Sequence, residues 1–205
     1  MFIPIGDTPN PQNFRPWVNW ALIAINVGVY LFIALPLSMA AVDMDAPSLR
    51  EYLTLLAREG MGMVDIQQVL ASMSSYDLLV YEYGYKPGAP SLTTLITGMF
   101  LHGGLAHMAG NMLFLYIFGD NIEHRLGRLT YLLVYLSTGA IATWSFALFA
   151  GDSMVPLVGA SGAISGVLGL YFLLFRRNRV KVFLFFFPLI NVFLVPARIV
   201  LGFYI

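Results

Sequence analysis

The chain has 205 residues, of which 59% are hydrophobic and only 11% are charged. Because soluble domains carry about 25% charged residues, this composition indicates a membrane protein. A net charge of zero argues against a nucleic acid partner, and the absence of cysteine excludes disulfides and thiolate metal sites.

Apolar segments of helical length follow one another along the chain. Residues 1–16 are expected to form a short polar tail, and the next apolar run, over 17–37, is long enough to span a bilayer. A long polar stretch over 38–91 forms the first outer loop, and four further helices are predicted over 104–122, 129–150, 161–175 and 182–205. The predicted fold is an all-α polytopic bundle, with five transmembrane helices in a single membrane domain over 1–205.

The helix predicted over 161–175 is too short to cross the hydrocarbon layer. About 15 residues at 1.5 Å each span about 22 Å, against a layer of about 30 Å. The cations between Arg176 and Lys181 hold one end of this helix in water. Ser161, at the other end, then lies below the surface, so a water-filled cavity must reach it. The loop over 151–160 must dip inward, which is tolerated only where protein or water lines it.

The placement of the cations predicts the orientation in the membrane. Most Lys and Arg side chains fall at one set of helix ends, namely Arg15, Arg125, Arg128 and the cluster over 176–181. Because short cytoplasmic segments are enriched in Lys and Arg, these ends and the N-terminus are predicted to be cytoplasmic. The long loop and Ser161 then open toward the outer face of a cell membrane.

Polar residues in these apolar helices suggest a reaction centre. Ser161 is framed by glycines at the start of its helix, and His107 and Asn111 lie four residues apart, on one helical face. A hydroxyl nucleophile with imidazole and amide donors is what acyl transfer needs to stabilise an oxyanion. From spacing alone, Gly162-Ala-Ile-Ser-Gly166 is better explained as a small-residue packing face, because such spacing is common, and the alternative for His107 and Asn111 is hydrogen bonding between helices.

Together, these motifs resemble the rhomboid family of intramembrane serine proteases. The resemblance covers roughly residues 100–170 and rests on His102-Gly-Gly-Leu-Ala-His107-Met-Ala-Gly-Asn111, Glu123-His-Arg125-Leu-Gly127 and Gly159-Ala-Ser161-Gly-Ala-Ile-Ser-Gly166.

The resemblance implies a role for each motif. Ser161 would be the nucleophile, while Asn111, His107 and the Ser161 N–H would bind the oxyanion beside Gly159. The other positions would be structural: Glu123 and Arg125 brace the turn after the second helix, and His102, Gly162 and Gly166 support the fold. No cofactor is implied. No metal site is expected either, because no carboxylate or thiolate completes a ligand set with His102 and His107.

One part of the family pattern is missing from residues 1–205. The family's catalytic dyad takes its histidine from a sixth helix, whereas the histidines of this chain are His102, His107 and His124. We therefore expect a chain truncated before that helix and nearly inactive without it, because losing the base of a serine catalytic unit costs on the order of 10⁶ in rate. The alternative is a catalytically dead rhomboid-like protein that binds transmembrane helices.

The predicted function is thus an intramembrane serine endopeptidase that cleaves membrane proteins in or next to their transmembrane segments. Its partners would be transmembrane substrates and the lipid bilayer. A transporter would need paired charges within the membrane, and Arg198 alone gives only weak support for a transporter. We expect the Arg198 side chain to snorkel to the membrane surface or to form an ion pair.

Overall fold

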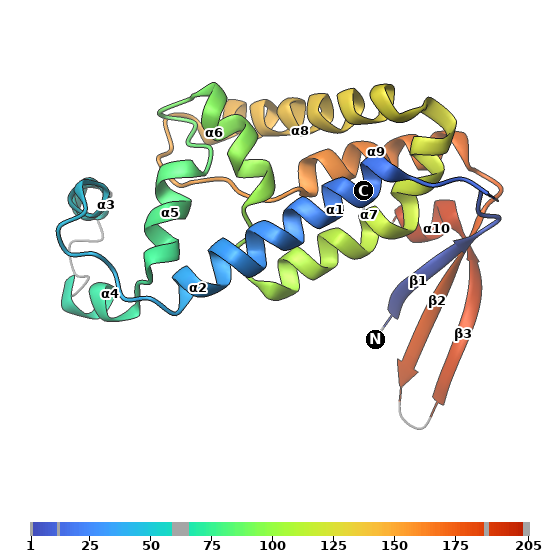
Figure 1. Cartoon of the computed structure of the whole chain (residues 1–205), viewed down its shortest axis with the longest axis horizontal. Helices are drawn as coiled ribbons and strands as arrows, with labels where there is room; N and C mark the ends of the chain where they lie inside the picture. The colour runs from blue at the N-terminus through green and yellow to red at the C-terminus, as the bar shows by residue number, and fades with distance from the viewer. Residues whose placement is uncertain (1, 12, 59–65, 187–188, 203–205) are drawn as a thin grey trace.

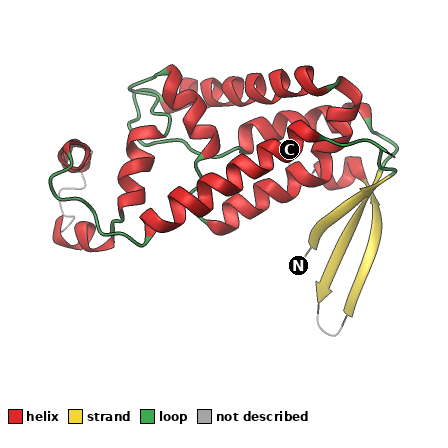
Figure 2. Ribbon diagram, in the orientation of Figure 1, coloured by secondary structure: helices red, strands yellow, loops and turns green. Residues whose placement is uncertain are grey.

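The computed structural model describes residues 2–11, 13–58, 66–186 and 189–202, and most of them are helical (Figures 1 and 2). Helix α1 (Trp17–Val29) continues through a π-helical turn, η1 (Tyr30–Ala34), into α2 (Leu35–Ser38). The loop region then holds four short helices and a 3-10 turn: α3 (Pro47–Arg58), α4 (Ile66–Ser72), α5 (Ser75–Tyr83), α6 (Leu92–Thr97) and η2 (Gly98–Phe100).

Three long helices complete the bundle: α7 (Leu105–Leu126), α8 (Arg128–Ala150) and α9 (Ser161–Leu174). With the α1–α2 rod they agree with the first four predicted helices. Two of these segments, Trp17–Ser38 and Arg128–Ala150, are long and apolar enough to cross a membrane, while α9 is apolar but shorter. The structure therefore fits a helical membrane protein.

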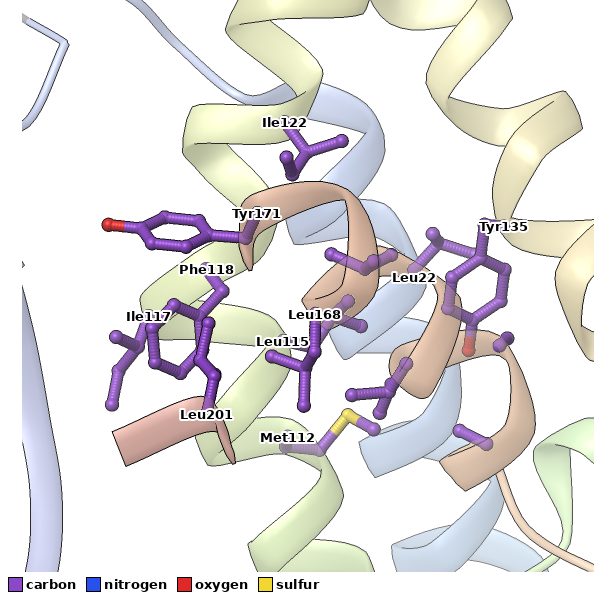
Figure 3. Close-up of a cluster of buried hydrophobic side chains, with 14 of the residues drawn as sticks. Leu22, Met112, Leu115, Ile117, Phe118, Ile122, Tyr135, Leu168, Tyr171 and Leu201 are labelled. Atoms are coloured by element: carbon purple, nitrogen blue, oxygen red, sulfur yellow. The ribbon is translucent and has the colours of Figure 1, made fainter. Parts of the chain in front are cut away.

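The core lies where α1, α7 and α9 meet (Figure 3). On α7, Leu115, Phe118 and Ile122 are fully buried, and their spacing of three and four residues places them on one face of that helix. Tyr171 of α9 packs edge-on against Phe118, with ring centroids 4.9 Å apart. This packing fixes the direction of α9, and therefore the position of Ser161 at its first turn.

Small residues bring α8 and α9 close together. A Cβ added to Gly162 would lie 2.7 Å from the Cβ of Ala142, and one added to Gly166 would overlap the side chain of Thr138. Close approach of this kind is typical of helix pairs in membranes, where van der Waals packing and small residues drive association.

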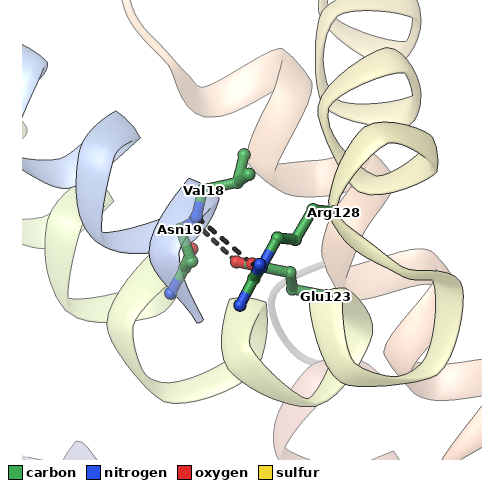
Figure 4. Close-up of polar contacts among 4 residues, drawn as sticks. All are labelled: Val18, Asn19, Glu123 and Arg128. Carbon is green, nitrogen blue, oxygen red and sulfur yellow. Dashed lines mark hydrogen bonds and ion pairs between the residues drawn. The ribbon is translucent and has the colours of Figure 1, made fainter. Parts of the chain in front are cut away.

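Glu123 ties the end of α7 to the start of α1 (Figure 4). Its buried carboxylate accepts hydrogen bonds from the N–H groups of Val18, at 3.2 Å, and Asn19, at 2.7 Å. These are first-turn groups that have no partner within their own helix. The cation beside Glu123 is Arg128, with Nε at 3.9 Å, whereas Arg125 is exposed. Glu123 thus caps α1 and pairs with Arg128.

The prediction of a fifth long helix over 182–205 is wrong for the described part of that range. Residues Arg179–Phe186 form β2, Leu189–Pro196 form β3, and helix α10 covers only Ala197–Gly202. The segment is rich in Val and Phe, which favour strands. Pro196 would lie inside the predicted helix, where it has no backbone N–H to donate to the helical hydrogen bonds. Pro188 lies outside the described residues. Arg198 is exposed on α10.

The expected N-terminal tail also contains a strand. β1 (Phe2–Thr8) pairs antiparallel with β2, so the three-stranded sheet has the order β1-β2-β3. Asp7 of β1 is 4% exposed and accepts hydrogen bonds from the Tyr171 hydroxyl of α9 and from Nδ2 of Asn121 in α7, at 2.9 Å from the latter. The N-terminus is therefore fastened to the end of α9 opposite Ser161.

Candidate active site

The segment that leads into Ser161 is held by hydrogen bonds to residues that precede α7. Tyr85 and Leu157 exchange two backbone hydrogen bonds, at 3.0 and 2.7 Å, and the N–H of Gly159 donates to the carbonyl of Gly98 at 2.8 Å. Gly159 has φ +122°, a conformation that side chains other than glycine rarely adopt. The chain can therefore turn sharply into α9, which places Ser161 at the first helical residue.

Ser161 is exposed and lies between two cavities. One cavity, of about 180 Å³, lies against α8 and is lined by Met99, Gly139 and Phe146 among others. The other, of about 300 Å³, lies against α7 and is lined by His107, Asn111 and Ser165 together with Ser161. The structure thus brings the three residues with proposed chemical roles to the wall of one cavity.

His107 and Asn111 face this cavity from the first turns of α7. The ring of His107 packs against Gly159, because a Cβ added there would lie 2.8 Å from Cε1 and 3.1 Å from Nε2 of that ring, and 3.7 Å from Oγ of Ser161. Nδ2 of Asn111 donates to the carbonyl of His107 at 3.0 Å. An amide nitrogen carries two N–H donors, so one remains for a ligand. The first-turn N–H groups of α9, beginning with that of Ser161 at the cavity wall, have no partner within their own helix.

His102 lies behind this site and contacts the turn before Ser161. It is 1% exposed, its Nε2 accepts from the N–H of Ala160 at 3.5 Å, and its ring stands edge-on to that of His107 with centroids 5.3 Å apart. Burial, with a smaller contribution from His107, lowers the pKa of His102 to about 4. A neutral His102 can accept this hydrogen bond at physiological pH, which is consistent with the structural role expected for it.

Tyr76 of α5 is a site residue that the sequence did not reveal. Its hydroxyl donates to the carbonyl of His102 at 2.8 Å and accepts from the N–H of the same residue at 3.1 Å. The two residues are 26 positions apart, and no local pattern links them. The same holds for Gly98, whose carbonyl accepts a hydrogen bond from the N–H of Gly159, far away in the sequence. His124 lies at the opposite end of α7, against the ring of Phe14.

Comparison with known proteins assigns the family. A model of the Rhomboid domain matches residues 89–205, which is more than half of the chain. The chain belongs to the rhomboid family. This family is membrane-embedded, in keeping with the two spanning-length helices, and the matched region contains every residue of the candidate site except Tyr76 and Tyr85.

Three similar rhomboid proteins show how far the likeness extends. Rhomboid protease GluP of Bacillus subtilis (strain 168) is 42% identical over 93 residues, which are 44% of this chain and 17% of that protein. RHOMBOID-like protein 6, mitochondrial, of Arabidopsis thaliana is 28% identical over 170 residues, 80% of this chain and 52% of that protein. Rhomboid protein 1, mitochondrial, of Saccharomyces cerevisiae (strain ATCC 204508 / S288c) is 32% identical over 129 residues, 60% of this chain and 36% of that protein.

This rhomboid chain thus spans between 17% and 52% of the length of these three relatives. The comparison with solved structures gives no match. Relatives named as proteases and relatives named only as rhomboid-like proteins both occur among the similar proteins.

Proposed function

We propose that this chain carries the nucleophile and the oxyanion site of an intramembrane serine endopeptidase. The observation that supports this most directly is the shared cavity, of about 300 Å³, which Ser161, His107 and Asn111 all line. Small-residue packing alone does not require an exposed hydroxyl beside an imidazole and an amide. The glycines serve packing as well, since Gly162 and Gly166 let α8 and α9 approach.

In the proposed reaction, Oγ of Ser161 forms a bond to the scissile carbonyl carbon of a substrate. The hydroxyl proton passes to a general base, and the carbonyl oxygen becomes an oxyanion that accepts from Asn111 Nδ2, the His107 ring N–H and the Ser161 N–H. Collapse breaks the C–N bond, the amine leaves with the proton, and water then hydrolyses the acyl-enzyme. The substrates would be membrane proteins cut in or next to a transmembrane segment.

The family resemblance implies that the general base is a histidine on a sixth helix, and none of residues 1–205 is proposed for that role. The three histidines of this chain are differently placed. Nε2 of His102 already accepts from Ala160, His124 packs against Phe14, and His107 is assigned to the oxyanion. The second candidate is a family member that binds transmembrane helices without cleaving them.

For orientation, we propose that the ends of α7 and α9 that carry most of the cations are cytoplasmic. The exposed Arg125, Arg128, Arg176 and Arg177 support this assignment through the positive-inside rule. Ser161 then opens toward the outer face of a cell membrane, and cleavage would occur near the outer leaflet.

Labelling with a fluorophosphonate separates the two candidates. The chain is expressed together with whatever its reading frame encodes after Ile205, and compared with Ser161→Ala and Ser165→Ala. Ser165 is the matched control, because it is exposed one turn later and lines the same cavity. Labelling that is lost in Ser161→Ala and kept in Ser165→Ala supports the peptidase. A protein that folds and is labelled in none of the three forms is the non-catalytic relative.

The oxyanion role has its own test. We expect Asn111→Ala to lower kcat/KM by about 10²–10³ on a transmembrane substrate, as the loss of one oxyanion donor does elsewhere. An unchanged rate with an unchanged thermal midpoint would remove Asn111 from the mechanism.

A further inference from the structure

The end of the bundle that carries the sheet has an exposed, positively charged surface. The ends of α1, α7, α8 and α9 meet there, and the sheet leaves from the same place (Figure 1). Exposed cations cover this end: Arg125, Arg128, Arg176, Arg177, Arg179 and Lys181. The acidic side chains described at this end do not balance them at the surface, because Asp7 and Glu123 are buried and Asp120 is only partly exposed.

The four cations between positions 176 and 181 make no ion pair with any described residue. Among the described residues at this end, the one ion pair with an N···O distance within 4.0 Å joins Arg128 and Glu123. Arg176 and Arg177 lie in the turn after α9, and Arg179 and Lys181 lie at the start of β2. Four guanidinium and ammonium groups that have no acidic partner among the described residues form a surface that fits anions.

Next to these cations, the sheet exposes apolar side chains. The register places Lys181 opposite Leu194 and Phe183 opposite Val192, so these four side chains share one face. Val192 is 49% exposed and Leu194 is 51% exposed. The other face holds Val180 and Val182, which are buried in the core. An antiparallel sheet in water usually has one apolar and one polar face. Here the open face carries Arg179 and Lys181 at one end, and its other described residues on β2 and β3 are apolar.

The direction of the sheet lets it follow a membrane surface. Its strands leave the end of the bundle sideways, at a steep angle to the long helices (Figure 1). The outer edges of β1 and β3 carry backbone groups that need hydrogen bonds, which hydrocarbon does not supply and the headgroup layer does. The sheet therefore suits the interface, with its base among headgroups and its apolar face turned to acyl chains.

We propose that this surface, formed by Arg176, Arg177, Arg179, Lys181 and the open face of β2 and β3, binds anionic phospholipid headgroups. The cations contact the lipid phosphates, and Val192 and Leu194 contact the acyl chains of the same lipids. The apolar neighbours distinguish this partner from a free phosphate or a nucleic acid, which would leave them in water. The site lies at the end of α9 opposite Ser161 and does not depend on the proposed peptidase activity.

The absence of cysteine from the sequence makes a clean labelling experiment possible. Leu194→Cys carries a spin label, and the protein is placed in nanodiscs of phosphatidylcholine alone or mixed with phosphatidylglycerol. We expect the label to gain contact with oxygen and lose contact with a water-soluble nickel chelate when phosphatidylglycerol is present. The control is Leu92→Cys, an exposed position of α6 near the other end of the bundle, which should not respond to the lipid charge.

Charge neutralisation tests the headgroup contact. Replacing Arg176, Arg177, Arg179 and Lys181 by Gln should weaken retention of phosphatidylglycerol in native mass spectrometry by about fivefold per cation, the typical effect of one basic residue at an anionic surface. The matched control is Arg50→Gln, an exposed cation of α3 in the long loop. Circular dichroism checks that each variant is folded. A label that stays in water in both lipids, or a retention equal in the fourfold and control variants, overturns the proposal.

Discussion

Replacing Asp7 by asparagine should remove a pH dependence from the stability of this chain. Asp7 is 4% exposed and accepts hydrogen bonds from Tyr171 and Asn121. Burial raises the pKa of its carboxyl from 3.8 to about 6. The hydrogen bond from Tyr171 offsets part of this rise, and the nearby carboxylate of Asp120 adds to it. The folded chain therefore holds a proton on Asp7 that the unfolded chain releases at lower pH.

The size of the effect follows from the two pKa values. A change from 3.8 to about 6 corresponds to about 3 kcal/mol at about 1.36 kcal/mol for each pH unit. Because the folded-state pKa is the higher of the two, the protonated Asp7 contributes its full stabilisation to the free energy of unfolding below pH 3.8. This stabilisation is lost as the pH rises through about 6. Asparagine resembles the protonated carboxyl in shape and charge, and it can accept the same two hydrogen bonds at any pH.

Unfolding in detergent, followed by circular dichroism between about pH 4 and about pH 8, measures this difference. Relative to the unsubstituted chain, Asp7→Asn should gain up to about 3 kcal/mol in free energy of unfolding across that range, with most of the gain between the two pKa values. The control is Asp152→Asn, an exposed carboxyl in the loop after α8, which should show no such trend. A difference between Asp7→Asn and the unsubstituted chain that stays constant with pH would refute the account.

Two further substitutions test the packing of the bundle. Glu123→Gln keeps the size of the side chain but loses one of the two acceptors that cap α1, so the free energy of unfolding should fall by about 1–3 kcal/mol; an unchanged thermal midpoint would contradict the capping role. Gly166→Ala places a methyl group on the side chain of Thr138 and should destabilise by about 1–3 kcal/mol. Gly169→Ala, in the same helix with no atom within 4 Å, should be neutral or slightly stabilising, and equal effects of the two would argue against close α8–α9 packing.

The long helices of the bundle were predictable because their signals are local. The runs that became Trp17–Ser38 and Arg128–Ala150 are apolar over the length of a span, and the cations flank them in the sequence. The short α9 was also predictable, because Arg176 follows its last apolar residues and Gly159 precedes its first turn. Hydrophobic length and charge placement need no tertiary contact to be recognised.

The C-terminal segment shows where local signals are insufficient. An apolar run of this length fits either one membrane helix or two strands. Prolines at 188 and 196 are compatible both with kinks inside one helix and with boundaries between separate elements. The choice of strands depends on β1, which provides hydrogen-bond partners for β2 from about 175 positions away. Such a pairing leaves no trace in the composition of either segment.

For the site, the sequence alone singled out the residues that we propose carry the chemistry: Ser161 between glycines, and His107 and Asn111 one turn apart on another apolar helix. Only the tertiary structure decided what holds them. The Tyr76 hydroxyl donates to the carbonyl of His102, Nε2 of His102 accepts from the N–H of Ala160, and Arg128 lies beside Glu123. The reason is physical: residue type and helical spacing are set by neighbours along the chain, whereas these hydrogen bonds and ion pairs exist only after distant segments have packed.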